Sequence, residues 1–371
     1  MSKWEWKEFE DCIERVKYTT KIPSKDYLQE GEFPIVSQED CLISGYWNDR
    51  SDLFKVTKPI VIFGDHTKVL KYIDFDFVLG ADGVKILCPK DYLNAHFFFY
   101  FLKSVNFDNL GYARHYRLLK ELSVPIPPLS EQKRIVKFLD EEFSKIDSLK
   151  TNAETNLKNA KELFETTLEK ELNPLSRHSE RSEESSAELP SGWEWVALNN
   201  VCKKIFAGGD KPQNCSKKSN EILSVPVYAN AIENEGLYGY TDKAVVKEPC
   251  LTISARGTIG FTVKRTEPFV PIIRLIVLIP KLDVIDLDYF FFSVKHLKIV
   301  GNGTSIPQLT VPLVKQYTIP LPPISVQKEI VARLDKLSEN VKRLEANYKQ
   351  IIADCDELKK SILKKTFEGE S

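Results

Sequence analysis

The segment Val124-Pro125-Ile126-Pro127-Pro128-Leu129-Ser130-Glu131-Gln132-Lys133 decides the architecture of this chain, because it occurs twice. It returns 195 residues later as Ile319-Pro320-Leu321-Pro322-Pro323-Ile324-Ser325-Val326-Gln327-Lys328. In both copies a short β-type stretch is followed by a diproline and then by a long segment with helical periodicity. We therefore expect each half of the chain to end in a strand, a proline stop and a long helix.

Further matches extend this repeat toward the start of each half. Trp4-Glu5-Trp6 returns as Trp193-Glu194-Trp195 after 189 residues, and Ile86-Leu87-Cys88-Pro89 corresponds to Val277-Leu278-Ile279-Pro280 after 191. The aromatic segment Phe98–Phe101 corresponds to Tyr289–Phe292 at the same shift. Small loop insertions account for the drift from 189 to 195. Several matches in the same order predict an internal duplication.

The two long helices carry apolar residues with the alternating four-and-three spacing of a coiled-coil seam. The positions expected to form the seam or to dock a partner are Val136, Leu139, Phe143 and Ile146 in the first helix and Leu334, Leu337, Val341 and Leu344 in the second. Ser325 is the expected N-cap of the second helix, and Lys150 interrupts the first seam. Because neither helix can bury its seam alone, we expect them to pair with each other.

These features predict an α+β chain with two globular regions, each made of short strands and helices, separated by two long helices that pair as an antiparallel coiled coil. The expected segments are 1–128 (first globular region), 129–172 (first helix), 173–189 (polar linker), 190–320 (second globular region) and 321–371 (second helix). Each globular region should include one aromatic helix, over 92–105 and 287–299. Antiparallel pairing would relate the two regions by a pseudo-twofold axis.

The charge balance argues against binding nucleic acid by bulk charge, because 52 Lys and Arg face 53 Asp and Glu in 371 residues. The two globular regions nevertheless differ. Residues 1–128 hold 17 basic and 19 acidic residues, whereas residues 190–320 hold 15 and 11. The N-terminus lacks a signal-peptide pattern, no apolar run is long enough to span a membrane, and the seven cysteines are scattered. We expect a reduced, cytoplasmic protein without disulfides.

The motifs of common enzymes and metal sites are absent from the sequence. There is no GxxxxGK[ST] phosphate loop and no HExxH, and the five histidines are not spaced as metal ligands. Glu131-x-Lys133 resembles the end of a nuclease motif, but it stands at a helix start and its repeat counterpart is Val326-x-Lys328. The sequence therefore predicts no catalytic residue, no metal site and no cofactor in this chain.

A symmetric spacer that carries two similar regions suits the recognition of two sites along a DNA duplex. The polar and basic residue types that contact phosphates and base edges from loops are Arg, Lys, Asn, Gln, His and Tyr. The DNA-binding candidates are Arg50, His66, Lys68, Arg114, His115, Tyr116 and Arg117 in the first half and Lys217, Tyr238, Arg256, Lys264 and Arg265 in the second. A solvated surface charge is the competing interpretation of each. A coiled-coil scaffold that binds only proteins, and an enzyme with an unrecognised site, remain alternatives for the whole chain.

Taken together, the sequence resembles the DNA-specificity subunits of type I restriction–modification systems over nearly its whole length. The resemblance rests on the two helix-entry segments, on Leu189-Pro190-Ser191-Gly192-Trp193-Glu194-Trp195, on Ser254-Ala255-Arg256-Gly257-Thr258-Ile259-Gly260 and on Ser305-Ile306-Pro307-Gln308-Leu309-Thr310. The first half departs from this pattern, with Phe63-Gly64-Asp65-His66-Thr67 and Gly111–Arg117 at the corresponding places. Such divergence is expected where each half recognises a different half-site.

The resemblance implies a non-catalytic subunit with two target-recognition domains that recognise the two parts of an asymmetric double-stranded DNA site. The helices would fix the gap between the two parts. The implied partners are two modification subunits, which bind S-adenosylmethionine and methylate adenine, and restriction subunits could join them. ATP and Mg²⁺ would likewise belong to those partners.

Overall fold

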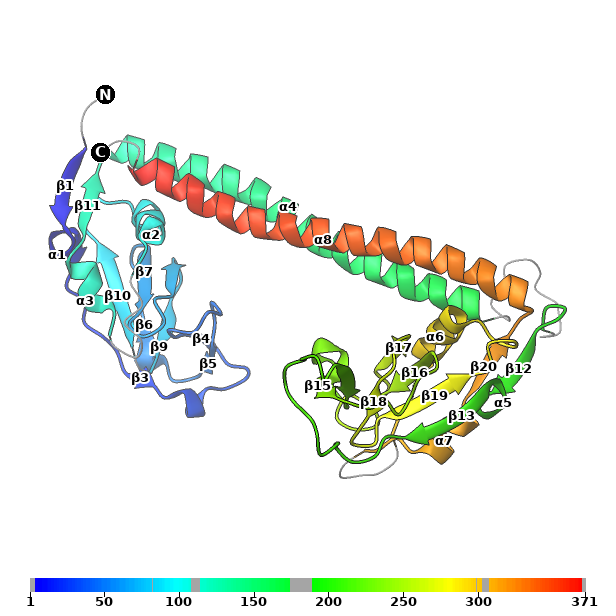
Figure 1. Cartoon of the computed structure of the whole chain (residues 1–371). Coiled ribbons are helices and arrows are strands. Elements are labelled where there is room, and N and C mark those ends of the chain that lie inside the picture. Colours follow the sequence, from blue (N-terminus) through cyan, green and yellow to red (C-terminus); the bar gives the residue numbers. More distant parts are fainter. Residues whose placement is uncertain are drawn as a thin grey trace. The chain divides into compact units, whose positions relative to one another are not determined.

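The computed structural model of the protein describes residues 4–81, 83–107, 114–173, 189–297, 299–301 and 307–368. The chain divides into two compact units (Figure 1). Unit 1 comprises Met1–Thr155 and Tyr348–Ser371, and unit 2 comprises Asn156–Asn347. Each unit thus holds one globular part and a segment of each long helix, so the helices are not a compact unit of their own. The interior of the expected linker, 174–188, lies outside the described residues.

Unit 1 contains an antiparallel sheet, a mixed sheet and a small strand pair. The pair joins β1 (Glu5–Glu8) to β11 (Ser123–Ile126). The first sheet has the order β2 (Ile13–Glu14), β10 (Val84–Pro89), β7 (Ile60–Gly64), β8 (Leu70–Ile73). The second has the order β3 (Lys21–Ile22), β9 (Phe77–Gly80), β4 (Phe33–Val36), β5 (Gly45–Trp47), and β6 (Leu53–Phe54) also pairs with β9. The helical elements are α1 (Phe9–Cys12), η1 (Ser24–Asp26), η2 (Arg50–Asp52), α2 (Ala95–Ser104) and α3 (Tyr116–Lys120).

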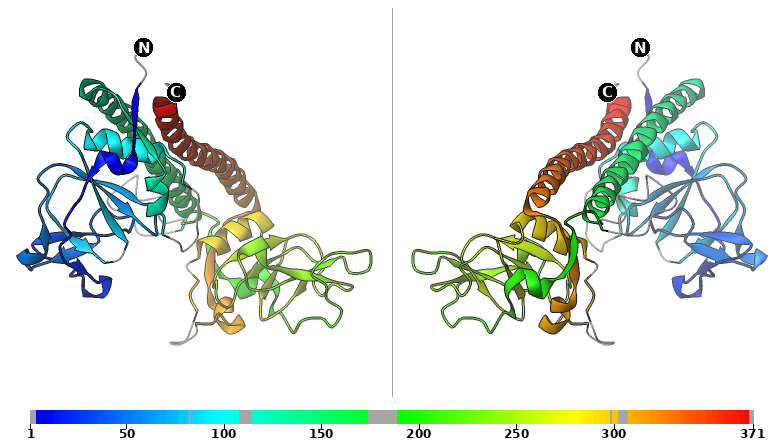
Figure 2. Two further views of the ribbon diagram at one scale, coloured as in Figure 1. Left: turned by 90° about the vertical axis from the view of Figure 1, so that its left-hand side faces the viewer. Right: turned by 90° about the vertical axis from the view of Figure 1, so that its right-hand side faces the viewer.

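Unit 2 repeats this plan. Its strand pair is β12 (Glu194–Ala197) with β20 (Thr318–Leu321), and its main sheet has the order β13 (Cys202–Ala207), β19 (Ile276–Pro280), β16 (Cys250–Ile253), β17 (Thr262–Arg265). The other sheet has the order β15 (Leu237–Thr241), β14 (Val225–Tyr228), β18 (Val270–Pro271). The helical elements are α5 (Leu198–Val201), η3 (Glu233–Gly236), α6 (Leu287–His296) and α7 (Val311–Gln316). Figure 2 shows each unit from two further sides.

The correspondence between the units extends to strand direction. The pairs β4–β9 and β14–β18 are both parallel, and β7–β10 and β16–β19 are both antiparallel. The central strands β7 and β16 are mostly apolar and completely buried, as expected of strands covered on both faces. The predicted α+β fold of two related globular parts and two long helices is confirmed. The expected aromatic helices are α2 and α6.

The long helices are α4 (Leu129–Leu172) and α8 (Ile324–Glu368). Within unit 1, Lys150 pairs with Asp356 and Asp147 pairs with Lys359, so residue numbers rise along one helix as they fall along the other. The helices are therefore antiparallel there. Within unit 2, Arg333 of α8 pairs with Glu171 of α4 at 2.7 Å. In both units apolar side chains of the helices also join the core of the globular part.

A buried glutamine in the first turn of each long helix joins it to the neighbouring aromatic helix. Gln132 accepts a hydrogen bond from the Asn94 amide at 2.7 Å and donates to the carbonyls of Tyr92 and Pro127. Gln327 accepts from the Asp286 amide at 2.8 Å and donates to Val284 and Pro322 in the same way. Asn94 and Asp286 in turn cap α2 and α6 through their side chains. This glutamine lock orients each long helix on its globular part.

The seam differs in part from the expected heptads. Leu139, Ile146, Leu334 and Val341 are buried, and Val136, Phe143 and Leu337 are partly buried. The exception is Leu344, which is 38% exposed. Ile351 and Leu358 follow it at intervals of seven and are exposed as well, so these three residues form a stripe on the outer side of α8. A second correction concerns Ser325. The carbonyl of Pro323 accepts the first helical hydrogen bond, from the Gln327 amide, so Ser325 lies inside the first turn.

Candidate nucleic-acid interface

In unit 1 the candidate interface is built around the turn that follows β7. Asp65 is 2% exposed and accepts the Tyr116 amide hydrogen at 2.8 Å through Oδ1, while its backbone carbonyl accepts the His115 amide hydrogen. The side chain of Gln38 accepts the His66 amide hydrogen at 3.3 Å. The hydroxyl of Thr67 donates to the Gln38 carbonyl at 2.7 Å. These bonds hold the turn after β7, a loop beyond β4 and the entry of α3 together.

In unit 2 the turn after β16 is held in a comparable way. The side chain of Asn230 accepts the Ala255 amide hydrogen at 2.7 Å, and the Ala255 carbonyl accepts the Leu309 amide hydrogen at 3.0 Å. Arg256 is exposed and donates through Nη2 to the Gln308 side chain at 3.0 Å. The Ala255 carbonyl accepts the Leu309 amide hydrogen as the Asp65 carbonyl accepts that of His115, so Ala255 is the counterpart of Asp65. Arg256 therefore stands at the position of His66, and Gln308 at that of Arg114.

Most of the first-half candidates have accessible side chains. Arg50, Arg114 and Arg117 are exposed, and His66, Lys68 and Tyr116 are partly exposed. His115 is different, because it is 1% exposed and its Nδ1 lies 3.0 Å from the Asp65 carbonyl. Its side chain cannot reach a duplex from this position. We therefore remove His115 from the set of DNA contacts and assign it to the packing of this loop.

The second-half candidates also divide by burial. Lys217 lies over the ring of Tyr238 at 3.8 Å and donates to the Tyr238 carbonyl, so these two residues form one basic, aromatic surface. Lys264 forms an ion pair with Asp288, which links β17 to α6. Arg265 is 4% exposed and its guanidinium lies 3.5 Å from the centre of the Tyr228 ring. The burial of Arg265 argues against the predicted DNA contact, because its donors face Glu235 and Thr252 inside the unit.

The electrostatic environment of these buried residues fits a structural role. Burial lowers the pKa of Arg265, and the neighbouring Tyr228 and Glu235 oppose that shift. Burial also raises the pKa of Tyr228 to about 12, with a further contribution from its hydrogen bond to Glu267. In unit 1, burial lowers the pKa of Lys71, whose ammonium donates to the carbonyls of Ser37 and Cys41. The charged groups of Arg265 and Lys71 therefore make their hydrogen bonds within their own unit.

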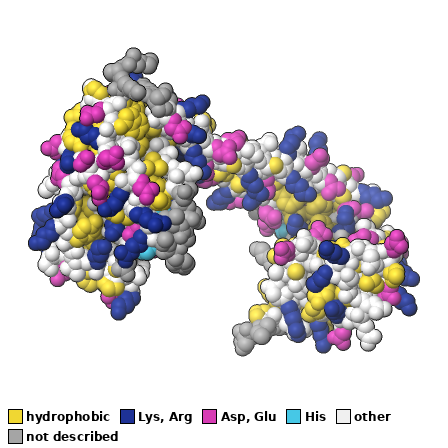
Figure 3. Space-filling model, turned by 60° about the vertical axis from the view of Figure 1, so that its left-hand side comes forward, with side chains coloured by type: hydrophobic (Ala, Val, Ile, Leu, Met, Phe, Trp, Pro, Cys, Tyr) yellow, Lys and Arg dark blue, Asp and Glu magenta, His cyan; other side chains and the backbone are white. Residues whose placement is uncertain are grey.

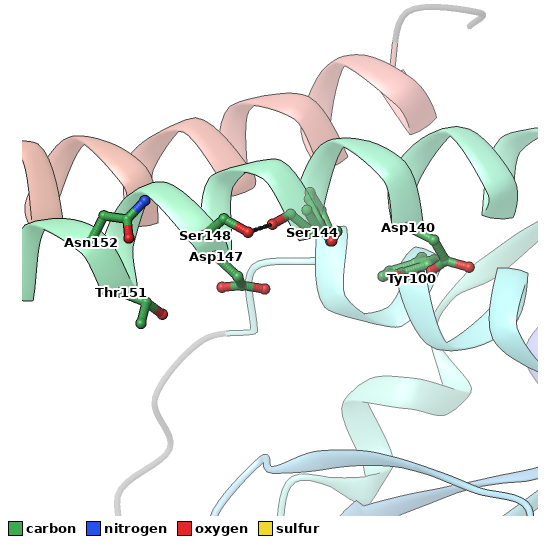
Figure 4. A pocket seen from close by; sticks show the side chains of 8 residues that line it. Tyr100, Asp140, Ser144, Asp147, Ser148, Thr151 and Asn152 are labelled. Atoms are coloured by element: carbon green, nitrogen blue, oxygen red, sulfur yellow. Dashed lines mark hydrogen bonds between the residues drawn. The ribbon is translucent and has the colours of Figure 1, made fainter.

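The charges on unit 1 are unevenly spread. On the face that Figure 3 shows, Lys and Arg gather in the lower half of unit 1, and Asp and Glu are more frequent above them. A groove beside α4 contains the carboxylates of Asp140 and Asp147 together with Tyr100 and several hydroxyl and amide side chains (Figure 4). Two carboxylates repel DNA phosphates, so this groove is a poor surface for a duplex.

Sequence reasoning did not single out Gln38 and Asn230, whose side chains accept amide hydrogens of the two turns. They are separated by 192 residues, within the range of the repeat shift, and each stands two residues after an equivalent strand. That spacing is the signal that could have identified them. No group of side chains within the described ranges has the composition of a metal site. None of the described helices is both long and apolar enough to cross a membrane.

A family model described as "Type I restriction modification DNA specificity domain" matches residues 1–159 and 190–353. Among curated proteins, the chain is 29% identical over 221 residues to a putative type I specificity subunit, S.MpnORF507P, from Mycoplasma pneumoniae; this covers 60% of the chain and 56% of that protein. It is 25% identical over 362 residues to the specificity subunit of the type I restriction enzyme EcoBI from Escherichia coli, covering 88% of the chain and 75% of that protein. The chain spans 43% to 60% of the lengths of the first three curated relatives that it matches.

The fold also has a counterpart among solved structures. A chain from a study of complex assembly and conformational transition of the type I R-M system superposes with a TM-score of 0.74 over 100% of this chain and 98% of that one. The sequence identity is 18%, so the likeness concerns the fold. It covers both globular parts and both long helices.

Proposed function

This chain belongs to the type I restriction–modification DNA specificity family, and we propose that its two units recognise the two halves of an asymmetric duplex DNA site. The observation that carries the proposal is the pair of equivalent turns after β7 and β16. In both turns a backbone carbonyl, that of Asp65 or Ala255, accepts an amide hydrogen from the segment before α3 or α7. The side chains beside this shared contact are His66 and Arg114 in one unit and Arg256 and Gln308 in the other. Different side chains on the same backbone positions would recognise different base pairs.

The test of this proposal is a map of methylated sites. The full chain is co-expressed with its modification subunit in a host without other adenine methylation, and the modified adenines are located by sequencing. The expected result is one split, asymmetric motif with an unspecified gap. If the complex neither methylates nor binds duplex DNA, the proposal fails and a scaffold that binds only proteins becomes the better interpretation.

We further propose that the long helices set the gap between the half-sites. Inserting one heptad into α4 within 136–167, with a matching heptad in the facing part of α8, lengthens each helix by ~10.5 Å and keeps the apolar register. Since base pairs are stacked about 3.4 Å apart, the gap should grow by about three base pairs while both half-sites stay the same. The matched control inserts the same seven residues after the exposed Glu221 and should leave the gap as it was. An unchanged gap after the helix insertion would rule out the spacer role.

Two copies of one modification subunit are the proposed protein partners. Several exposed apolar residues occur in repeat-related pairs: Trp6 with Trp195, Leu149 with Leu344, and Leu163 with Leu358. A surface that occurs twice suits a partner that binds twice. Leu149→Asp or Leu344→Asp alone should each remove one partner copy, and the double variant both, as measured by native mass spectrometry. S-adenosylmethionine, and the ATP and Mg²⁺ of any restriction subunit, would bind to these partners.

A further inference from the structure

Two neighbouring residues of unit 2 have left-handed backbone conformations without being glycine. Ile273 has φ 51° and Arg274 has φ 65°, in the turn between β18 and β19. This region is unfavourable for residues with a Cβ, and most of all for β-branched ones. At the corresponding position in unit 1, 191 residues earlier, stands Gly83, with φ 75°. Gly83 and Arg274 thus share a left-handed backbone conformation, but only Arg274 places a side chain on it.

The surrounding residues hold this turn in place. The amide of Ile273 donates to the Gly209 carbonyl at 2.9 Å, and the amide of Arg274 donates to the Gly208 carbonyl at 3.2 Å. Close approach of the chains requires glycine at 208, because a Cβ there would lie 2.6 Å from the carbonyl carbon of Pro271. The Asn230 side chain donates to the Ile273 carbonyl at 2.5 Å. Strained conformations persist where the structure fixes them in this way, and they gather at functional positions.

Asn230 also connects this strained turn to the candidate interface. Its amide nitrogen contacts Ile273, while its amide oxygen accepts from Ala255, the residue before Arg256. Gln308 accepts a hydrogen bond from the Arg256 guanidinium and lines one small pocket together with Arg274. Three side chains that can contact bases, Arg256, Arg274 and Gln308, are therefore gathered on linked loops.

The side chain of Arg274 is available for a ligand. It is exposed, and within the described part of the chain its guanidinium makes neither a hydrogen bond nor an ion pair. The buried Arg265 is the opposite case, since its donors are satisfied inside the unit. An exposed arginine that is kept on a strained, firmly held turn has no evident use in the packing of unit 2.

We propose that Arg274 is a specificity-determining residue of unit 2 and that it contacts the edge of a guanine in the half-site which this unit recognises. This inference rests on the proposed function. The planar guanidinium has two donors with the spacing of guanine O6 and N7, which is the commonest specific contact in the major groove. Gln308 fixes the orientation of Arg256 beside it. In unit 1 the same three positions hold His66, Gly83 and Arg114, so that unit lacks one of the three contacts.

The test uses the full chain in complex with its modification subunit and compares Arg274→Gly with Ile273→Gly. Both substitutions place glycine on the same left-handed turn and both should raise the thermal unfolding temperature of the chain. Only Arg274→Gly should relax one position of the unit 2 half-site, with roughly a 10- to 100-fold loss of discrimination against the wrong base pair there. The other half-site should stay the same. Arg274→Lys keeps the charge without the planar pair of donors and should relax the same position.

Two results would overturn the inference. One is an Arg274→Gly complex with the wild-type methylation motif. The other is a uniform loss of affinity for all duplexes, because that behaviour belongs to a phosphate contact rather than to a base contact. A wild-type complex that does not recognise DNA would instead contradict the proposed function itself, so the two failures are distinguishable.

Discussion

The glutamine lock provides a quantitative test of how the long helices are attached. Replacing Gln132 by Met keeps a side chain of similar length but removes one hydrogen-bond acceptor and two donors. The partners left behind are the Asn94 amide and the carbonyls of Tyr92 and Pro127. Gln132 is 0% exposed, so water cannot easily replace these bonds.

The size of the effect follows from these contacts. Each of the three hydrogen bonds contributes a net stability of about 1 kcal/mol. Partners that find water lower the total loss of stability and partners that stay buried without a bond raise it, which gives a range of about 2–4 kcal/mol. Since about 1.4 kcal/mol corresponds to a factor of ten, opening of unit 1 should become roughly 30- to 700-fold more frequent. Burial of the Met side chain offsets part of this loss, which favours the lower end of the range.

Hydrogen exchange followed by mass spectrometry measures this opening segment by segment, which matters because a chain with two units does not unfold in a single step. Peptides covering α2 should exchange faster in Gln132→Met, while peptides covering α6 should exchange as in the wild type. Gln327→Met is the matched control and should give the reverse pattern. If α2 exchange in Gln132→Met stays within about threefold of the wild type, the lock does not hold the helix on unit 1, and the estimate from hydrogen bonds is refuted.

Three further predictions concern other parts of the chain. His96 is stacked between Tyr72 and Tyr100, and burial lowers its pKa although Asp140 and Asp74 oppose the shift. Because the unfolded state then binds the proton more tightly than the folded state, unit 1 should lose stability as pH falls below about 6.5. His96→Phe should flatten that pH dependence in thermal melts at about pH 5.5 and 7.5. Arg265→Met should destabilise unit 2 by about 2–4 kcal/mol in urea titrations, whereas the methylation motif of the folded complex should stay as it is. Lys150→Ala breaks a solvent-screened ion pair with Asp356 and should leave the urea unfolding midpoint of unit 1 nearly unchanged, so a clear loss of stability would show that this lysine fixes the helix register.

The overall architecture could be predicted because the repeat and the helical periodicity are local properties of the sequence. The seam was less predictable. A strict seven-residue repeat drifts by about 20° per heptad around a straight helix, so it stays in the contact only where the helices supercoil enough. In α8 Val341 and Cys355, two heptads apart, stay buried, and the buried position has moved by one residue at Leu363. The other seam position is uncovered at Leu344, Ile351 and Leu358. The pattern identified the apolar residues but not the side of the helix that a neighbour would cover.

The candidate interface was harder to predict than the fold, because burial depends on contacts between distant segments. Arg114, His115, Tyr116 and Arg117 look alike as a run of polar residues, but only His115 is drawn inward by the carbonyl of Asp65. In the same way, nothing within Lys264-Arg265 indicates that one cation is exposed and the other is covered by Tyr228. The repeat shows which residues occupy equivalent backbone positions only after the structures of unit 1 and unit 2 are aligned.

The alignment of Gly83 with Arg274 leads to a consequence for how such a chain can change its specificity. Both units have the left-handed backbone at this position. Its surroundings differ, because a Cβ at Gly83 would lie 2.4 Å from the Gln38 side-chain oxygen, so a larger residue there requires that side chain to move. A non-glycine residue there costs about 1 kcal/mol or more in backbone strain. Arginine at this position therefore lowers the stability of unit 2, and glycine in unit 1 avoids that cost. If Arg274 recognises a base, stability and recognition are opposed at this residue, and Gly83→Arg should destabilise unit 1 while adding a preference at one position of its half-site.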